Sequence, residues 1–337
     1  MWVYSFSLRR QIVLLAVFSV MSNAAYAEWS SGFDFSTYYT DDVGLFSVTR
    51  RLSLDEDPTQ PIVDEPNQGA DAVYEPNAYV SWATENELGE FELTLDAGGY
   101  IFNSYSAYTH GFFQMEVAQA LTEKTTIKFL YDFVPRLFIG VKSLAQDEHG
   151  EGEGEGDERL NSHIWSMHLE HKLFNNLMLR GLVRYGLRDY DQPFAYRDTQ
   201  FFTVGSHFEW AITSDIALLA GYHFERGYTD HKQTVYYQDD IAYINHFASA
   251  ELKIHLLPKL EMRVIFDYEH NDFTSSYTED IHYAGNENVY QGELEFLYEL
   301  TETTLLKAGW QHGSRKFNYE QFSVQNNNVW LGVEFHI

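Results

Sequence analysis

The chain has 337 residues, of which 50 are acidic and 22 are lysine or arginine, so its formal net charge is −28 at pH 7. This acidic excess argues against binding to the phosphate backbone of nucleic acids, which requires clustered cations. The mean hydropathy is −0.35 and the chain contains no cysteine, so we expect neither a bundle of membrane helices nor a disulfide framework.

The first 27 residues have the pattern of a secretory signal peptide. Arg9 and Arg10 precede the apolar run IVLLAVFSVM, and the small-residue cleavage site Ala25-Tyr26-Ala27 follows it. We therefore expect residues 1–27 to be removed on export, and the mature protein, residues 28–337, to begin at Glu28.

Short polar turns alternate with longer acidic or Gly/Asn-rich connections along the mature chain. The short turns lie at 85–89, 122–125, 175–176, 213–215, 257–259 and 301–304. The longer connections lie at 41–72, 103–107, 140–159, 190–196, 229–240, 273–288 and 320–327. This rhythm predicts an all-β, up-and-down transmembrane barrel of about 14 antiparallel strands, with tight periplasmic turns, long external loops and both termini periplasmic.

The segments between these connections alternate apolar and polar residues with period two. Segment 260–270 places Val264 and Phe266 on one face and Arg263 and Asp267 on the other, and segments 202–212 and 290–300 repeat the pattern. Segment 127–139 is expected to place Phe129, Leu137 and Ile139 towards lipid and Arg136 towards the interior. The segments exceed the ~5–6 residues typical of strands in globular sheets. A soluble β-sandwich, which would also alternate, is the alternative.

The polar faces are predicted to line the interior of the barrel. In segment 177–190, LMLRGLVRYGLRDY, three arginines recur every four residues on this face and form a ladder opposite acids from other strands. The predicted pore-lining residues are Arg180, Arg184, Arg188, Glu209, Glu225, Glu251, Glu261, Arg263, Asp267, Glu269, Glu293 and Glu295. Two interpretations of the ladder remain open: a strip that binds anionic or sugar-like groups of a solute, or partners that neutralise wall carboxylates and stiffen the barrel.

Neither a metal site nor a catalytic site is expected. His168 faces the interior, whereas His163 and His171 share the opposite face, so the three do not converge on one ion. The acidic segment 145–160, AQDEHGEGEGEGDERL, lacks the ligand spacing of an EF-hand and is interpreted as a solvated external loop, with weak binding of divalent cations as the alternative. No Ser/His/acid arrangement is apparent, so we expect no enzyme and no cofactor.

The chain ends in NNNVWLGVEFHI, in which apolar residues alternate up to the last position. This ending resembles the C-terminal strand of Gram-negative outer-membrane β-barrels, which the barrel assembly machinery recognises, although those strands usually end in Phe or Trp and this one ends in Ile337. Together with the turn rhythm, the resemblance extends over the whole mature chain to porin-like outer-membrane proteins of small to medium size.

The resemblance implies a protein of the cell outer membrane, surrounded by lipid and lipopolysaccharide, through which small hydrophilic solutes diffuse. Because acids outnumber bases on the predicted lumenal faces, we expect a preference for cations. The alternative function is a non-transport barrel that acts in surface binding, assembly or polysaccharide export through its long loops.

Overall fold

The computed structural model describes residues 27–46, 52, 58–61, 68–143, 155–229, 240–278, 280 and 282–337. The predicted signal peptide lies outside these residues except for Ala27, as do the central parts of several long connections. Within the described residues, no helix is long and apolar enough to cross a membrane.

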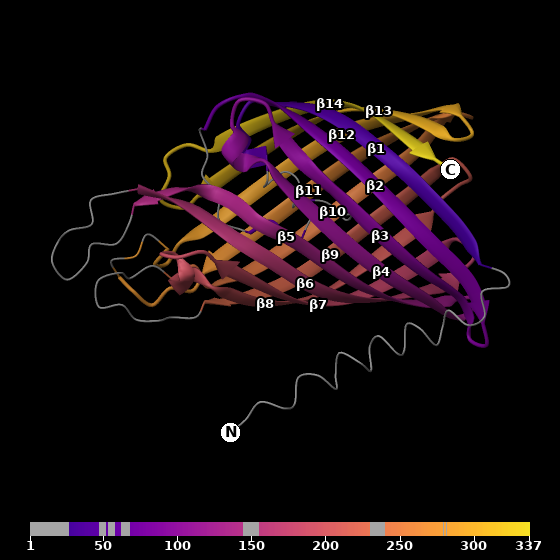
Figure 1. Cartoon of the computed structure of the whole chain (residues 1–337), viewed down its shortest axis with the longest axis horizontal. Helices are drawn as coiled ribbons and strands as arrows, with labels where there is room; N and C mark the ends of the chain where they lie inside the picture. Colours follow the sequence, from indigo (N-terminus) through magenta and orange to yellow (C-terminus); the bar gives the residue numbers. More distant parts are fainter. Residues whose placement is uncertain are drawn as a thin grey trace, which may run out of the picture.

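The described chain forms fourteen antiparallel strands that close into one barrel (Figure 1). Each strand pairs with its neighbours in the sequence, and the last strand pairs with the first. The strands are β1 (Glu28–Thr40), β2 (Asp71–Asn86), β3 (Gly89–Phe102), β4 (His110–Thr122), β5 (Thr125–Ser143), β6 (Glu155–Phe174), β7 (Leu177–Tyr190), β8 (Thr199–Ala211), β9 (Ile216–Thr229), β10 (Tyr243–Leu257), β11 (Leu260–Phe273), β12 (Asn286–Thr301), β13 (Thr304–Phe317) and β14 (Val324–His336). The predicted fold class and strand number are confirmed.

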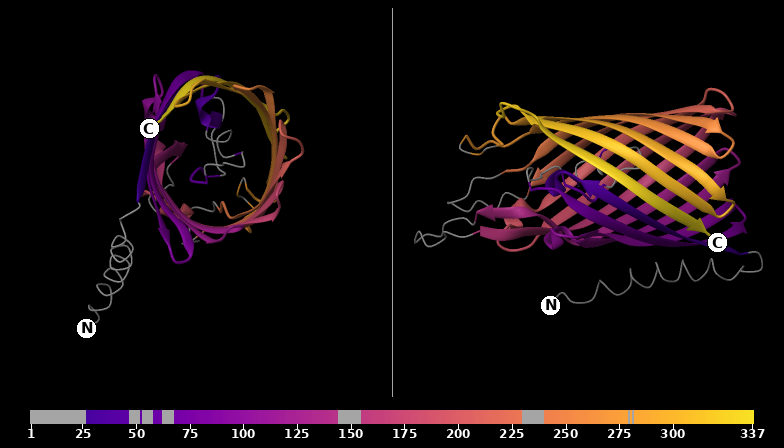
Figure 2. Two further views of the ribbon diagram at one scale, coloured as in Figure 1. Left: turned by 90° about the vertical axis from the view of Figure 1, so that its right-hand side faces the viewer. Right: turned by 90° about the horizontal axis from the view of Figure 1, so that it is seen from above.

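Connections of two to four residues lie at one end of the barrel, called here the short-turn end, and the other connections lie at the long-loop end. The β2–β3 turn shows how the sequence makes such a tight reversal. Gly89 adopts φ +133°, which side chains disfavour, and Asn86 Oδ1 accepts hydrogen bonds from the backbone N–H groups of Leu88 at 2.8 Å and Gly89 at 3.2 Å. The chain enters β1 and leaves β14 at the short-turn end (Figure 2).

The two faces of the strands follow the predicted alternation in segments 202–212, 260–270 and 290–300. Val264 and Phe266 are exposed on the outer surface of β11, whereas Asp267 is buried in the interior. A closed barrel satisfies the backbone hydrogen bonds of every strand internally, so exposed apolar side chains on the outside can face lipid.

β5 departs from the predicted alternation because it contains a β-bulge. Pro135 and Arg136 stand opposite the single residue Asn161, and Arg136 has φ +49°. Proline has no N–H group for the strand ladder, so its presence favours such an irregularity. The bulge exchanges the faces beyond it, so Leu137 is buried in the interior and Arg136 is exposed, and a second register shift, between Phe138 and Gly140, accompanies the burial of Ile139 in the interior. The predicted faces of these three residues are wrong.

The interior at the long-loop end is filled by side chains and by the β1–β2 connection. Chain from this connection, coloured indigo to purple, lies inside the ring of strands in the view along the barrel (Figure 2). Leu45 and Leu52 pack against Phe247 and Val289 of the wall. A second apolar cluster joins Val134, Leu137, Ile139, Leu160, Tyr190, Phe194 and Ile241. Short 3-10 helices at η2 (Ser106–Tyr108) and η3 (Ala195–Arg197) cover the adjoining strand ends.

Candidate functional site

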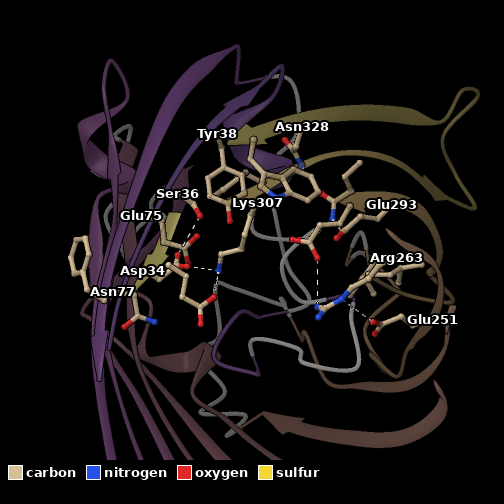
Figure 3. A pocket seen from close by; sticks show the side chains of 18 of the residues that line it. Asp34, Ser36, Tyr38, Glu75, Asn77, Glu251, Arg263, Glu293, Lys307 and Asn328 are labelled. Atoms are coloured by element: carbon tan, nitrogen blue, oxygen red, sulfur yellow. Dashed lines mark hydrogen bonds and ion pairs between the residues drawn. The ribbon is translucent and has the colours of Figure 1, made fainter. Parts of the chain in front are cut away.

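A cavity with a volume of about 560 Å³ lies against the walls formed by β1, β2 and β10–β14 (Figure 3). We call it the acidic cavity, because six carboxylates line it against two cations, Arg263 and Lys307. The carboxylates belong to Asp34, Glu75, Glu251, Glu293, Glu295 and Glu334. Alternation within each strand turns all of these side chains inward, and closure of the barrel brings β1 and β2 beside β14.

Both cations of the acidic cavity contact carboxylates directly. Lys307 forms an ion pair with Asp34 and another with Glu334 at 2.9 Å. On the facing wall, Arg263 forms ion pairs with Glu261 at 2.7 Å, Glu295 at 3.6 Å and Glu251 at 3.7 Å. Figure 3 shows the two groups on opposite sides of the cavity. Because six carboxylates face only two cations, the lining of the cavity keeps an excess of negative charge after both cations are paired.

Aromatic rings line the acidic cavity between the β1 and β14 walls and the β1–β2 connection. Tyr38 lies 5.4 Å from Phe46 and 5.9 Å from Trp330 between ring centroids. The Trp330 side chain donates a hydrogen bond to Glu295. The cavity therefore offers apolar ring surface as well as carboxylates to a molecule that enters it.

A second cavity, of about 320 Å³, lies against β4–β9 on the other side of the interior. Arg180 and Arg184 of the arginine ladder line it. We call it the arginine cavity. Arg180 forms an ion pair with Glu170 of β6 at 2.8 Å, and Lys128 approaches the same carboxylate at 3.5 Å. Arg184 is buried and donates from Nε to the Ser166 hydroxyl at 3.4 Å. Arg180 therefore has the paired arrangement that was one of the two interpretations of the ladder.

Three histidines also line the arginine cavity: His168, His207 and His223. The rings of His207 and His223 stack with centroids 4.7 Å apart, and their Nε2 atoms are in contact. His168 faces the interior as predicted, while His163 stacks against Phe133 at 4.6 Å on the outer surface. Within the described residues, no group of three or more His, Cys, Asp or Glu side chains could hold a metal ion.

Arg188, the last arginine of the ladder, forms hydrogen bonds with the β1–β2 connection. Its guanidinium donates to the backbone carbonyls of Gln60 at 3.1 Å and Pro58 at 3.4 Å, and to the Tyr243 hydroxyl at 2.9 Å. It also lies 4.2 Å from the centroid of the Phe201 ring. A buried, charge-assisted contact of this kind fixes the connection inside the barrel.

The other predicted pore-lining residues lie on the inward face at different depths. Glu225 and Glu269 line a cavity of about 30 Å³ beside Arg188, and Glu225 accepts a hydrogen bond from Tyr243 at 2.6 Å. Asp267 is fully buried. Glu261 forms an ion pair with Arg263, and Glu209 lies partly buried near the short-turn end of β8.

The prediction did not include several residues of the acidic cavity, namely Asp34, Glu75, Lys307 and Glu334. Each lies on the inward face of its strand, so the same period-two rule could have identified the face. The rule does not give the height of a side chain in the barrel, and the pairing of Lys307 with Asp34 depends on closure between the first and last strands.

The acidic segment 145–160 lies partly outside the described residues, which resume at residue 155. Glu158 is completely buried and pairs with Arg197 at 2.6 Å, whereas Asp157 pairs with Arg159 at 3.1 Å. Glu158 is therefore part of the packed interior, and its expected place in a solvated loop is wrong.

Comparison with known proteins agrees with this architecture. Residues 233–337, which carry β10–β14, match a family model described as "Putative beta-barrel porin 2". No curated protein sequence matches the chain. The structure is similar to the outer membrane channel DcaP of Acinetobacter baumannii, with a TM-score of 0.51 and 9% identity over 92% of this chain and 97% of that chain.

Two further solved structures resemble it at lower scores. The TodX monoaromatic hydrocarbon channel deltaS2 mutant has a TM-score of 0.49 and 9% identity over 92% of this chain and 90% of that chain. The anion-selective porin from Comamonas acidovorans has a TM-score of 0.47 and 7% identity over 93% and 99% of the two chains. The chain thus has the closed-barrel fold of outer-membrane channels, and its residues 233–337 are similar to a family of β-barrel porins.

Proposed function

We propose that this barrel allows small hydrophilic solutes to diffuse across the outer membrane and that it prefers cations. The observation that carries the proposal is the acidic cavity, about 560 Å³ in volume, with six carboxylates against two cations. Barrel walls of low dielectric constant concentrate the field of these carboxylates in the aqueous space, which raises the local concentration of cationic solutes.

The packing at the long-loop end limits the size of the solutes. The described parts of the β1–β2 connection around Leu52 and Gln60 lie in the interior there, where Arg188 of one wall binds Gln60 and Gln291 of another binds Leu52. A solute must pass between this connection and the strands before it reaches the cavities. The channel is therefore narrower than the number of strands alone would allow, and we expect low conductance and a small size limit.

Three sugars of similar size test this function: glucose, glucosamine and glucuronate, which are neutral, cationic and anionic near neutral pH. Purified protein reconstituted into liposomes should admit glucosamine fastest, glucose at an intermediate rate and glucuronate slowest. Raising the ionic strength should reduce the difference, since screening lengths fall to about 3 Å at 1 M salt. Equal rates for glucosamine and glucuronate would contradict the proposed preference.

The filled interior at the long-loop end also supports a second candidate function. The barrel would then act in surface binding, assembly or polysaccharide export, and its long connections would do the work. A folded, correctly inserted barrel that admits none of the three sugars faster than protein-free liposomes would favour this candidate. No catalytic role is part of either proposal.

The membrane partners belong to the same proposal. Exposed apolar side chains such as Val264, Phe266 and Leu331 suit contact with lipid and with the acyl chains of lipopolysaccharide. The alternating C-terminal strand suits insertion by the barrel assembly machinery. The proposed partners therefore comprise outer-membrane lipid, lipopolysaccharide, this machinery and small solutes, without nucleic acid.

A further inference from the structure

Three neighbouring strands carry polar side chains at directly paired positions where the acidic cavity meets the packed interior. Ser249 of β10 pairs with Asp267 of β11, which pairs with Gln291 of β12. All three side chains face inward, and the residues are 6%, 0% and 1% exposed. Their closest inward neighbours along these strands, Glu251, Ile265 and Glu293, line the acidic cavity.

The hydrogen bonds around Gln291 fix the direction of its amide group. Nε2 donates to the backbone carbonyl of Leu52 at 2.8 Å and to Asp267 Oδ2 at 3.2 Å. Both partners are acceptors, so the nitrogen has to point towards them, which leaves the amide oxygen, Oε1, without a hydrogen-bond partner in the described chain. The side chain thus links the wall to the β1–β2 connection and leaves its amide oxygen available to a ligand.

Three oxygen atoms in this group lack a hydrogen-bond partner within the described residues: Ser249 Oγ, Asp267 Oδ1 and Gln291 Oε1. The Ser249 hydroxyl lies beside the Asp267 carboxylate, at a directly paired position of the next strand. No lysine or arginine in the described part of the chain forms an ion pair with Asp267, since Arg263 contacts Glu251, Glu261 and Glu295 instead. An ionised carboxylate buried without a positively charged partner is costly, so Asp267 needs either a proton or a bound cation.

We infer that Ser249, Asp267 and Gln291 form a binding site for a monovalent inorganic cation. Carboxylate, amide and hydroxyl oxygens are the ligands that hard cations prefer. One carboxylate among the three ligands balances one positive charge, whereas calcium sites commonly use several carboxylates. The ion lies at the inner end of the acidic cavity, and through Gln291 it stabilises the position of Leu52.

The melting temperature of the full-length barrel in detergent tests this site without requiring that the barrel conduct. Sodium chloride and potassium chloride are compared with N-methyl-D-glucamine chloride at the same ionic strength and pH. The bulky organic cation does not fit a buried three-oxygen site. We expect a saturable rise in melting temperature with sodium or potassium, as for any ligand that binds only the folded state.

Asp267→Asn should abolish this rise, because the substitution keeps the side-chain volume and removes the charge. Glu269→Gln is the matched control: Glu269 is a buried carboxylate two residues further along β11, and it accepts a hydrogen bond from Asn271 at 2.8 Å. This variant should keep the full cation-dependent rise. Ser249→Ala should keep the carboxylate and shift the response to higher cation concentrations.

Several results would overturn the assignment. Equal melting temperatures of the wild type in all three salts would show that no monovalent ion binds. A cation-dependent rise retained in Asp267→Asn would place the ion elsewhere, and a rise with calcium alone would exclude a monovalent site. Equal stability of Asp267→Asn and the wild type in every salt would indicate a protonated acid that binds no ion. If Asp267→Asn fails to fold, the ²³Na relaxation rate can be measured with the wild type and with Ser249→Ala instead. Weaker sodium binding by Ser249→Ala would support the site, and equal binding by the two proteins would contradict it.

Discussion

The two halves of the barrel interior differ in what fills them, although the same strands line both. In the half nearer the short turns, inward side chains surround cavities of about 560 and 320 Å³. In the half nearer the long loops, apolar clusters, buried ion pairs and the β1–β2 connection fill the same cross-section. A single strand passes through both environments, so the height of a residue in the barrel decides its role.

The arginine ladder on β7 illustrates this difference. Arg180 and Arg184 line the arginine cavity, whereas Arg188 is buried and holds the backbone of the β1–β2 connection. The acids on β12 change in the same way, since Glu293 and Glu295 line the acidic cavity and Glu287 is completely buried near Arg315. Residues of the same type on the same strand therefore line a cavity at one height of the barrel and form buried structural contacts at another.

The largest expected effect comes from breaking a buried ion pair in the packed half. Arg197→Gln leaves the completely buried Glu158 without its cation, and removal of one partner of a buried pair costs about 3–5 kcal/mol. Lys128→Gln in the hollow half is the control, because its side chain is 25% exposed and its carboxylate contacts are 3.4 and 3.5 Å long. Its loss should cost less than about 1 kcal/mol.

Urea unfolding in lipid vesicles, followed by tryptophan fluorescence, measures both losses. The comparison of the two halves predicts a much lower midpoint for Arg197→Gln than for Lys128→Gln. Similar midpoints for the two variants would mean that the packed half is hydrated to the same degree as the hollow half.

The second effect comes from releasing the β1–β2 connection, and it is measured as a change in conductance rather than in stability. Arg188→Gln removes charge-assisted hydrogen bonds to Gln60 and Tyr243, each worth about 1.5–3 kcal/mol. The connection should then move away from the wall, so single-channel conductance should rise. Arg180→Gln, at the short-turn end of the same ladder, should leave the conductance nearly unchanged. Equal conductance of the two variants would show that Arg188 does not hold the constriction.

The smallest effect concerns acid sensitivity at the long-loop end. Asp280, in the β11–β12 connection, accepts hydrogen bonds from Asp240 N at 2.8 Å and Ser275 Oγ at 2.6 Å. Burial raises the pKa of Asp280, but hydrogen bonds from His282, Ser275 and the backbone outweigh it and lower the pKa to about 2. Because the folded pKa lies below the unfolded one, this stabilisation is complete above about pH 4 and is lost as the pH falls towards 2.

The loss should be roughly 1–2 kcal/mol after allowance for solvent screening. Asp280→Asn should lack this part of the acid dependence when urea midpoints are compared between about pH 5 and pH 2. Asp189→Asn, which alters an exposed carboxylate, serves as the control. An acid dependence that persists in Asp280→Asn and equals that of the control would assign the sensitivity to other groups.

The sequence predicted the strands, the turns and most of the faces because these depend on local patterns. Alternation with period two gives the inward face of β11 directly, and Asn86 and Gly89 mark a tight turn. The bulge at Pro135 and Arg136 was missed because the pattern does not reveal where an extra residue enters the ladder. One such residue is enough to exchange the two faces.

The content of the interior could not be predicted in this way. The pairing of Lys307 with Asp34, the burial of Glu158 against Arg197 and the grip of Arg188 on Gln60 join segments far apart in the sequence. Each depends on the heights of the partners in the closed barrel and on the course of the long connections. The alternation therefore indicates which way a side chain points, whereas its surroundings depend on the closed barrel.

The reversal potential across a planar bilayer with a potassium chloride gradient tests most directly whether the acidic cavity selects the solutes. The wild type should show the sign of a cation-selective channel. Replacing Glu293 and Glu295 together by Gln should move the potential towards that of an unselective pore, while Glu123→Gln, which alters an exposed turn carboxylate, should leave it unchanged. An anion-selective wild type, or equal potentials for the wild type and the double variant, would contradict this account.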